Sequence, residues 1–253
     1  MPDTQSQHAP QRYVLFDGLR GLTMVSMILY HFCYDLFVVE GLNPDWPFLP
    51  AAHLWQQSIC CTFIALSGFC WAWVRRGNLR RGLWLNACGL AITAVTAIAM
   101  PGQIVLFGVL NFISCAILLT IPVDRLLRCI PALAGAVGAL ALFAFTKNIQ
   151  WGSVGFFGWQ ASVPAGLYTP LLTVFGFPAP GFWSSDFFPI FPWIFLFWLG
   201  YFLHRIFTQS RQNKDWAKVF LPIFSHFGKW SLWVYLVHQP ICFAVAMLLA
   251  RIL

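Results

Sequence analysis

Long apolar stretches restrict what this chain can fold into more than any other feature of its sequence. A helix needs about 20 predominantly apolar residues to cross the hydrocarbon core of a bilayer. Seven stretches are of about that length, and they cover residues 14–39, 54–74, 82–100, 103–122, 129–146, 188–207 and 227–250. Only 9% of the 253 residues are charged, whereas soluble domains average about 25%. The sequence therefore predicts an all-α fold, a polytopic membrane helix bundle of about seven transmembrane helices.

One further apolar piece, residues 163–178, is short and carries prolines near both ends and one inside. Such a piece is typical of a re-entrant or interfacial segment rather than a crossing. No internal repeat or soluble domain interrupts the chain, so we expect one integral-membrane domain over residues 1–253. Residues 1–12 are polar and lack the features of a signal peptide, which predicts a cytoplasmic tail and a retained first span.

Basic residues cluster in a few places, namely residues 75–81, Arg125 with Arg128, and residues 205–218. With a cytoplasmic N-terminus, the seven spans place 13 of the 15 Lys and Arg residues at or near the cytoplasmic face, as the positive-inside rule requires. We interpret these clusters as membrane-flanking loops, not as nucleic-acid contacts. The eight cysteines lie almost all in apolar stretches without a CxxC pair, which predicts neither a disulfide framework nor a metal site.

The first apolar stretch carries four ionisable side chains where a simple anchor would carry none. Taking Asp17 as zero and 100° per residue, Arg20 falls at about 300°, His31 at about 320° and Asp35 back at about 0°. All four therefore share one stripe of the helix. Charged groups inside a bilayer are costly, so they normally face the bundle interior and mark a functional path.

Two interpretations of this stripe remain open. Arg20 precedes His31 by about 16 Å of helix rise, so Arg20 would hold an anionic or carbonyl-bearing cofactor near the inner face while His31 transfers protons deeper in the membrane. Alternatively, the groups form a structural network in which Asp17 pairs with Arg20 and His31 with Asp35. His238 and Gln239 lie in the last span at a depth that could bring His238 close to His31, either to bind substrate or merely to bond a backbone carbonyl.

Five motifs together carry a family resemblance. They are FDGLRG at 16–21 followed by His31 and Asp35, TFIALSGF at 62–69, FGVLNFI at 107–113, SSDFFPIFPW at 184–193 and SLWVYLVHQP at 231–240. In this order they resemble the transmembrane acyltransferase superfamily, and most closely the small bacterial members similar to the heparan-alpha-glucosaminide N-acetyltransferase catalytic domain. The acyltransferase-three family is more distantly similar. The Ser-Gly pair of ALSGF is interpreted as a close-packing device rather than a nucleophile.

The resemblance implies an acetyltransferase of the bacterial inner membrane that takes acetyl-CoA from the cytoplasm and acetylates a sugar or envelope glycan. We expect the catalytic residues to be His31, Asp35 and His53. The expected donor-binding residues are Arg20, Asp17, Arg75 and Arg76. The expected acceptor-binding residues are Asp186, His238, Gln239 and Asn111. Membrane lipid is the other expected partner, and an oligomer is compatible with the sequence.

The chain departs from the family pattern at two places, with Asn111 where a histidine is expected and Phe187 where a tyrosine is expected. These departures leave open a non-catalytic membrane protein with a degenerate site. A proton-coupled transporter or lipid-handling protein would use the same polar stripe for a different purpose. Inverted repeats would favour a transporter, and the sequence shows no such repeat.

Overall fold

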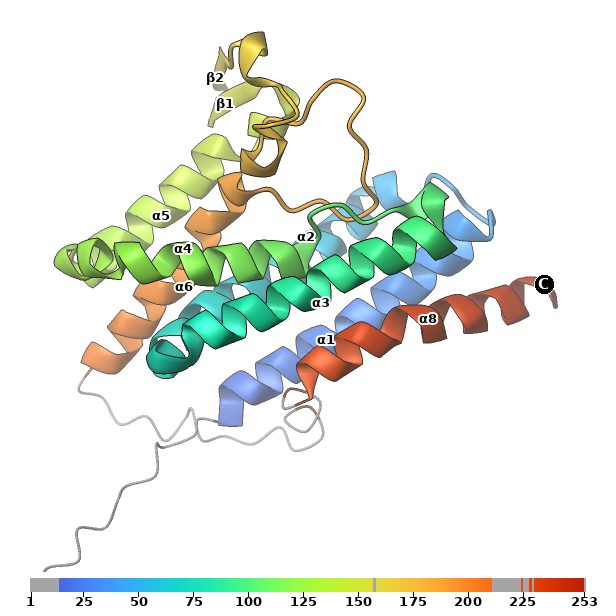
Figure 1. Cartoon of the computed structure of the whole chain (residues 1–253), viewed down its shortest axis with the longest axis horizontal. Coiled ribbons are helices and arrows are strands. Elements are labelled where there is room, and N and C mark those ends of the chain that lie inside the picture. The colour runs from blue at the N-terminus through green and yellow to red at the C-terminus, as the bar shows by residue number, and fades with distance from the viewer. Residues whose placement is uncertain (1–13, 157, 211–223, 225–227, 229, 253) are drawn as a thin grey trace, which may run out of the picture. The chain divides into compact units, whose positions relative to one another are not determined.

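The computed structural model describes residues 14–156, 158–210, 224, 228 and 230–252, and the fold over these residues is helical (Figure 1). The α-helices are α1 (Val14–Tyr34), α2 (Pro50–Trp71), α3 (Asn78–Ala99), α4 (Val109–Cys129), α5 (Ala132–Thr146), α6 (Ile190–Gln209) and α8 (Ser231–Ala250). A π-helical turn, Asp35–Val39, continues α1. The predicted cytoplasmic tail, residues 1–12, lies outside the described residues.

Six described segments are long and apolar enough to cross a membrane. One of them, Pro50–Ala99, is 50 residues long and contains α2, a 3-10 turn (Ala72–Gly77) and α3. Val74 inside this turn has non-helical angles, with φ −108° and ψ 19°, so the segment consists of two helices. Each of the seven predicted spans thus corresponds to one helix, and the prediction of an all-α membrane bundle is confirmed.

The predicted start of the fourth span, residue 103, was wrong by six residues, because α4 begins at Val109. The preceding residues cannot join the helix: Phe107 lies in the left-handed region with φ +54°, and Gly108 is extended. The predicted end at residue 122 was also too early, since Pro122 lies inside α4 and the helix continues to Cys129. The apolar pattern alone does not reveal either boundary.

The described residues form two compact units, which we describe separately. Unit 1 comprises Met1–Phe63 and Arg211–Leu253, and unit 2 comprises Ile64–Ser210. The prediction of a single integral-membrane domain over residues 1–253 stays a prediction.

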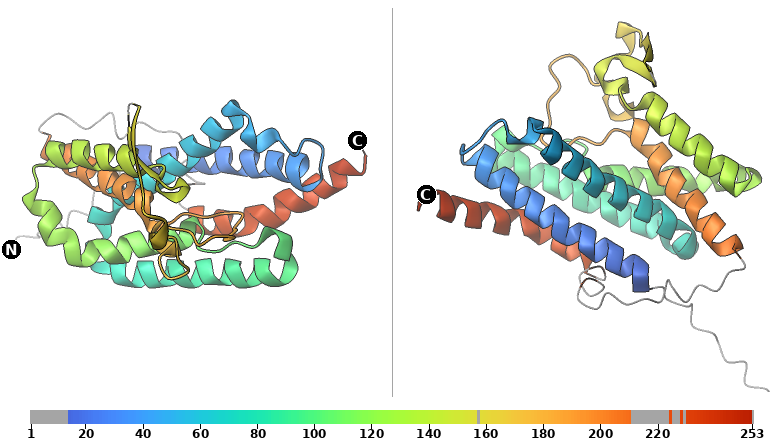
Figure 2. Two further views of the ribbon diagram at one scale, coloured as in Figure 1. Left: turned by 90° about the horizontal axis from the view of Figure 1, so that it is seen from above. Right: turned by 180° about the vertical axis from the view of Figure 1, so that it is seen from behind.

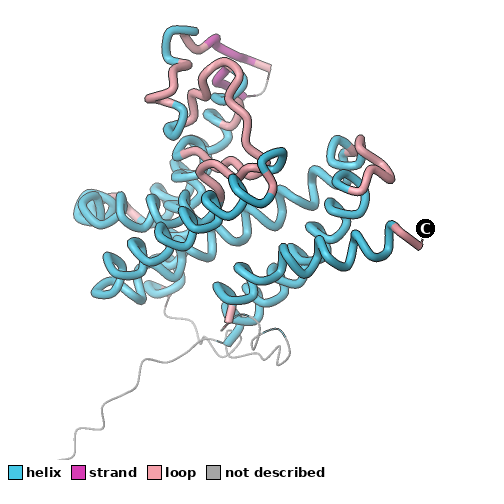
Figure 3. Tube along the Cα trace, turned by 45° about the vertical axis from the view of Figure 1, so that its right-hand side comes forward, coloured by secondary structure: helices cyan, strands magenta, loops and turns pink. Residues whose placement is uncertain are grey.

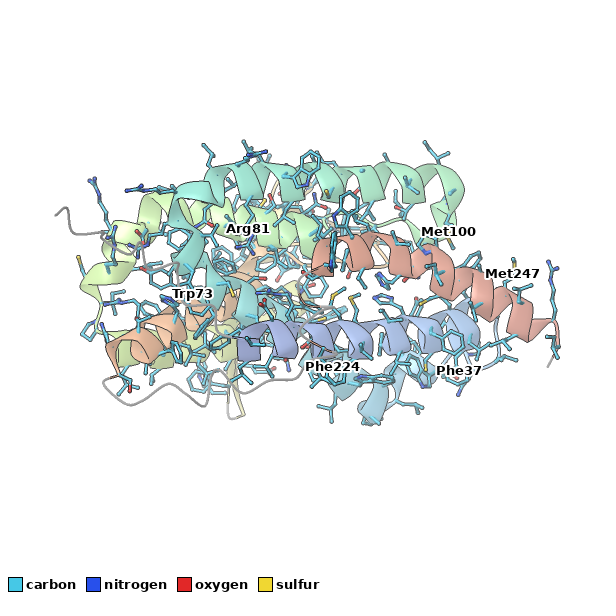
Figure 4. All side chains as sticks on the ribbon, turned by 90° about the horizontal axis from the view of Figure 1, so that it is seen from below. Phe37, Trp73, Arg81, Met100, Phe224 and Met247 are labelled. Carbon is cyan, nitrogen blue, oxygen red and sulfur yellow. The ribbon has the colours of Figure 1, made fainter. Side chains whose placement is uncertain are left out.

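In unit 1, α1 packs along α8, and the two helices lie side by side in Figures 1 and 2. The buried core of this unit contains Met24, Met27, Tyr30 and Ile59. At the start of α1 the backbones approach very closely, because a Cβ atom on Gly21 would overlap the carbonyl oxygen of Phe224, which Figure 4 labels. The last glycine of FDGLRG is therefore a packing requirement.

In unit 2, α3 packs on α4 and α5 packs on α6. The α3–α4 pair is antiparallel: Ser114 Oγ donates to the Gly82 carbonyl over 2.8 Å, and Asn111 Nδ2 donates to Asn86 Oδ1 over 3.1 Å. Glycines also allow α2 and α6 to touch through their backbones. A Cβ atom on Gly68 would overlap the Phe197 carbonyl oxygen, which agrees with the predicted packing role of the ALSGF glycine.

The connection between α5 and α6 contains the two described strands, β1 (Ser153–Phe156) and β2 (Trp159–Ser162). They form an antiparallel hairpin with Ser153 opposite Ser162, coloured magenta in Figure 3. The sequence did not predict this hairpin. The 163–178 stretch contains only two 3-10 turns, Ala165–Leu167 and Thr173–Phe175, so no helix in it can cross a membrane. Its interfacial location stays a prediction.

Candidate functional site

Two histidines face each other inside unit 1. The ring centroids of His31 in α1 and His238 in α8 are 5.0 Å apart at an interplanar angle of 61°. The sequence predicted that these side chains would lie at similar depth, and the structure brings them into contact. The pair belongs to the packed surface between α1 and α8, whose side chains are shown in Figure 4.

A backbone contact determines the tautomer of His238. Its Nδ1 atom lies 2.6 Å from the Tyr235 carbonyl oxygen. A carbonyl oxygen can only accept a hydrogen bond, so Nδ1 must carry the proton and donate it. In the neutral imidazole, Nε2 then has a free lone pair and acts as an acceptor. The bond from His238 to a backbone carbonyl, one of the two interpretations of this residue from the sequence, is therefore present. The same bond leaves Nε2 as the proton acceptor of the ring.

Next to the histidines, α1 and α8 share a second polar contact. Gln239 Nε2 donates to Asp35 Oδ1 over 3.0 Å, and Asp35 is only 1% exposed. Asp35 is the first residue of the π-helical turn, and such turns are frequent at functional sites. The structural interpretation paired Asp35 with His31, but the Asp35 carboxylate accepts from Gln239 instead. The partner lies 204 positions away in the sequence, which no helical projection of α1 can reveal.

Three buried atoms of this cluster have no hydrogen-bond partner among the described residues: Asp35 Oδ2, His238 Nε2 and Gln239 Oε1. Nearly all buried polar groups in proteins are satisfied, so each exception needs an explanation. Because the Nδ1 atom of His238 and the Nε2 atom of Gln239 are the donating atoms, the three remaining atoms are acceptors. The cluster is therefore suited to a ligand or water that supplies several hydrogen-bond donors.

The other two groups of the predicted stripe form an ion pair. Arg20 Nη1 lies 3.1 Å from Asp17 Oδ1, one helical turn apart in α1. The structure thus shows the local Asp17–Arg20 pairing that the structural interpretation predicted.

In unit 2, Arg75 is bound by an acidic residue that sequence reasoning missed. Asp124 accepts from Tyr201 Oη over 2.8 Å, from Arg128 Nη2 over 2.7 Å and from Arg75 Nη2 over 3.4 Å. Arg205 completes this end of the unit by donating to the Leu127 carbonyl in α4 and to the Ile130 carbonyl directly after it. Arg76 is exposed. Asp124 lies two residues beyond the predicted fourth span, and the signal that could have found it is an acidic residue directly beside the basic cluster of Arg125 and Arg128.

Asp186 caps α4 from a distant part of the chain. Its Oδ2 atom accepts from the Val109 backbone N–H over 3.2 Å, while Ser184 Oγ accepts from the Leu106 N–H over 2.8 Å. The motifs FGVLNFI and SSDFFPIFPW are therefore held together, and the carboxylate satisfies a free donor at the positive end of the helix dipole. Burial nevertheless raises the pKa of Asp186 to about 6, although the Val109 bond opposes that shift.

This raised pKa gives a testable pH dependence. The folded state binds the Asp186 proton more tightly than the unfolded state does, so its contribution to the unfolding free energy increases as the pH falls from about 6 towards 4. We expect thermal unfolding of the Asp186→Asn variant to lack this component. The Tm of the wild type minus the Tm of the variant should increase as the pH is lowered from 7.5 to 5. A difference that is constant with pH would show that Asp186 does not titrate in this range.

The contacts described for the remaining predicted residues do not involve the histidine pair. Asn111 is buried and bonded to Asn86, where Gly89 leaves space for its amide, which gives it a packing role between α3 and α4. His53 is exposed in the first turn of α2. Within the described residues, no group of three or more His, Cys, Asp or Glu side chains could hold a metal ion.

A comparison with protein families gives one match that extends over most of the chain. The model of the family described as heparan-alpha-glucosaminide N-acetyltransferase, catalytic, matches residues 12–240. This range includes all five motifs and the four clustered residues His31, Asp35, His238 and Gln239. Neither a curated protein nor a solved structure matches the chain.

Proposed function

The chain belongs to the heparan-alpha-glucosaminide N-acetyltransferase catalytic family, and from this membership we propose that it transfers an acetyl group from cytoplasmic acetyl-CoA to a sugar or envelope glycan. The family and the six membrane-crossing segments make it an integral membrane protein of the acetyltransferase type. The donor, the acceptor, the bacterial inner membrane and the cytoplasmic N-terminus are parts of the proposal.

The three buried acceptors beside His31 carry this proposal. A sugar supplies hydroxyl or amine N–H donors, and it could satisfy Asp35 Oδ2, Gln239 Oε1 and His238 Nε2 together. A purely structural network would pair these atoms within the protein, because an unsatisfied buried acceptor costs about 1–3 kcal/mol. The arrangement therefore supports a site that is completed by a polyhydroxylated or amine-bearing substrate.

The chemistry that follows is general-base acyl transfer. His238 Nε2 accepts the proton of the acceptor O–H or N–H while that oxygen or nitrogen attacks the thioester carbonyl carbon. The carbon–sulfur bond breaks, and the imidazolium returns the proton to the leaving thiolate, so that CoA departs as the thiol. His31, whose ring contacts that of His238, is the second imidazole of the centre. If His31 instead carries the acetyl group transiently, acetyl-CoA without acceptor would label the protein.

We propose Arg20, Asp17, Arg75 and Arg76 as the donor-binding residues. Two of these arginines already have carboxylate partners, Arg20 with Asp17 and Arg75 with Asp124. Each pairing fixes the orientation of a guanidinium, the group that binds phosphate oxygens with two parallel N–H bonds. The catalytic role of His53 and the acceptor-binding roles of Asp186 and Asn111 stay predictions. The contacts that the structure shows give Asp186 a capping role and Asn111 a packing role.

Donor binding can be measured directly on the purified protein in lipid nanodiscs. A ligand that binds only the folded state at 100 times its Kd stabilises that state by about 2.7 kcal/mol. We expect saturating acetyl-CoA to raise Tm by several degrees, and the Arg20→Ala variant to need a higher concentration for the same shift. An unchanged Tm at millimolar acetyl-CoA, with the protein folded, would contradict the proposed donor.

A further inference from the structure

Unit 2 has an open groove of about 700 Å³ at the beginning of α3, and the function proposed above does not use it. Its lining residues are Gly77, Leu79, Arg80, Arg81, Leu83 and Trp84. Leu79, Leu83 and Trp84 are 59%, 56% and 61% exposed. The groove therefore combines guanidinium groups with uncovered apolar side chains.

The helical spacing arranges these side chains in two adjacent rows. Residues four positions apart lie on the same face of a helix, so Leu79 and Leu83 form an apolar row beside the row of Arg80 and Trp84. The described groove lining contains no acidic residue. An occupant that fits both rows must have an anionic end and an alkyl part.

The sequence places this groove at the boundary of the membrane. From Gly82 to Met100 the chain has no charged residue, and its 18 residues 82–99 rise about 27 Å, close to the roughly 30 Å of the hydrocarbon core. Arg80 is thus at the level of the lipid headgroups, whereas Leu83 and Trp84 begin the hydrocarbon region. Tryptophan is enriched at this level of membrane helices.

We propose that this groove is a binding site for one phospholipid whose headgroup carries a net negative charge. The phosphate lies at the Arg80 guanidinium, which can bond it with two N–H groups, and an acyl chain covers Leu79 and Leu83. A zwitterionic headgroup fits less well, because its ammonium group would approach the same guanidinium groups. The nucleotide end of CoA also has phosphates, but it has no alkyl chain to cover the leucine row.

The test measures lipid retention by native mass spectrometry and Tm, with detergent-purified full-length protein and added phosphatidylglycerol or phosphatidylcholine. We expect one retained phosphatidylglycerol and a higher Tm with that lipid only. A juxtamembrane charge is worth about 1 kcal/mol, so Arg80→Ala should weaken retention about fivefold and Arg80→Glu about 25-fold. Arg125→Ala removes an exposed charge of α4 outside the groove and should have no effect.

Three results would overturn the proposal. Equal retention of phosphatidylglycerol and phosphatidylcholine would contradict a preference for an anionic headgroup. An equal loss of phosphatidylglycerol retention in Arg80→Glu and Arg125→Ala would contradict binding in this groove. Displacement of phosphatidylglycerol by millimolar adenosine 3′,5′-bisphosphate would assign the groove to a nucleotide. Because none of these readouts requires acetyl transfer, they are independent of the proposed enzymatic function.

Discussion

Replacing His238 with asparagine is expected to lower kcat for acetyl transfer by about 10²- to 10⁴-fold, the usual contribution of a general base. The asparagine amide can still donate to the Tyr235 carbonyl, which His238 Nδ1 does at 2.6 Å, but it has no atom equivalent to Nε2. The helix contact is therefore kept while the proton acceptor is lost. Steady-state kinetics with acetyl-CoA and a glycan acceptor measure this effect.

A matched variant separates this chemical role from a structural one. Gln239→Leu removes the bond to Asp35 without changing the imidazole, so it should raise KM for the acceptor more than it lowers kcat. Both variants should unfold within a few degrees of the wild type. If His238→Asn keeps wild-type kcat, His238 is not the base.

Gly68→Ala is expected to destabilise unit 2 by at least about 2–3 kcal/mol, at the upper end of overpacking effects. The added Cβ atom would overlap the carbonyl oxygen of Phe197, and a backbone carbonyl inside α6 cannot rotate away. Gly200→Ala should behave similarly, because its Cβ atom would overlap the Ala65 carbonyl oxygen. Thermal unfolding in detergent measures both variants.

The control for this prediction is Gly138→Ala in α5. A Cβ atom there meets no atom within 4 Å, and alanine favours a helix over glycine by up to about 1 kcal/mol. Gly138→Ala should therefore keep or raise Tm. If Gly68→Ala and Gly138→Ala have the same Tm, α2 and α6 do not depend on close backbone contact at Gly68.

The spans were predictable because hydropathy alone determines which segments can enter a membrane. The first prediction, residues 14–39, agrees with the described segment Val14–Val39. The start of α4 was not predictable, because the cap at Val109 comes from Asp186, 77 positions later. The β1–β2 hairpin was missed because its strands are only four residues long and precede residues 163–178, the only part of this connection for which the sequence predicted a structure.

The candidate site was predictable only in its composition. The depth of His31 and His238 followed from helix rise, since both helices begin near the membrane surface. The pairing of Asp35 with Gln239 did not follow, because it depends on how α8 is rotated against α1 and on the π-helical turn at Asp35. Contacts between segments far apart in the sequence, such as Arg75 with Asp124, have no signature in local periodicity.

The most direct test of the central claim follows acetyl groups labelled with ¹⁴C, using purified protein in sealed proteoliposomes, acetyl-CoA and a mixture of bacterial envelope glycans. We predict that each thiol released is matched by one labelled acetyl group on a glycan, and that His238→Asn lowers the rates of both signals by at least about 100-fold while its fold is retained. Glycan movement across the membrane without thiol release, or equal transfer by wild type and His238→Asn, would contradict an acetyl-transfer centre at the α1–α8 histidine pair.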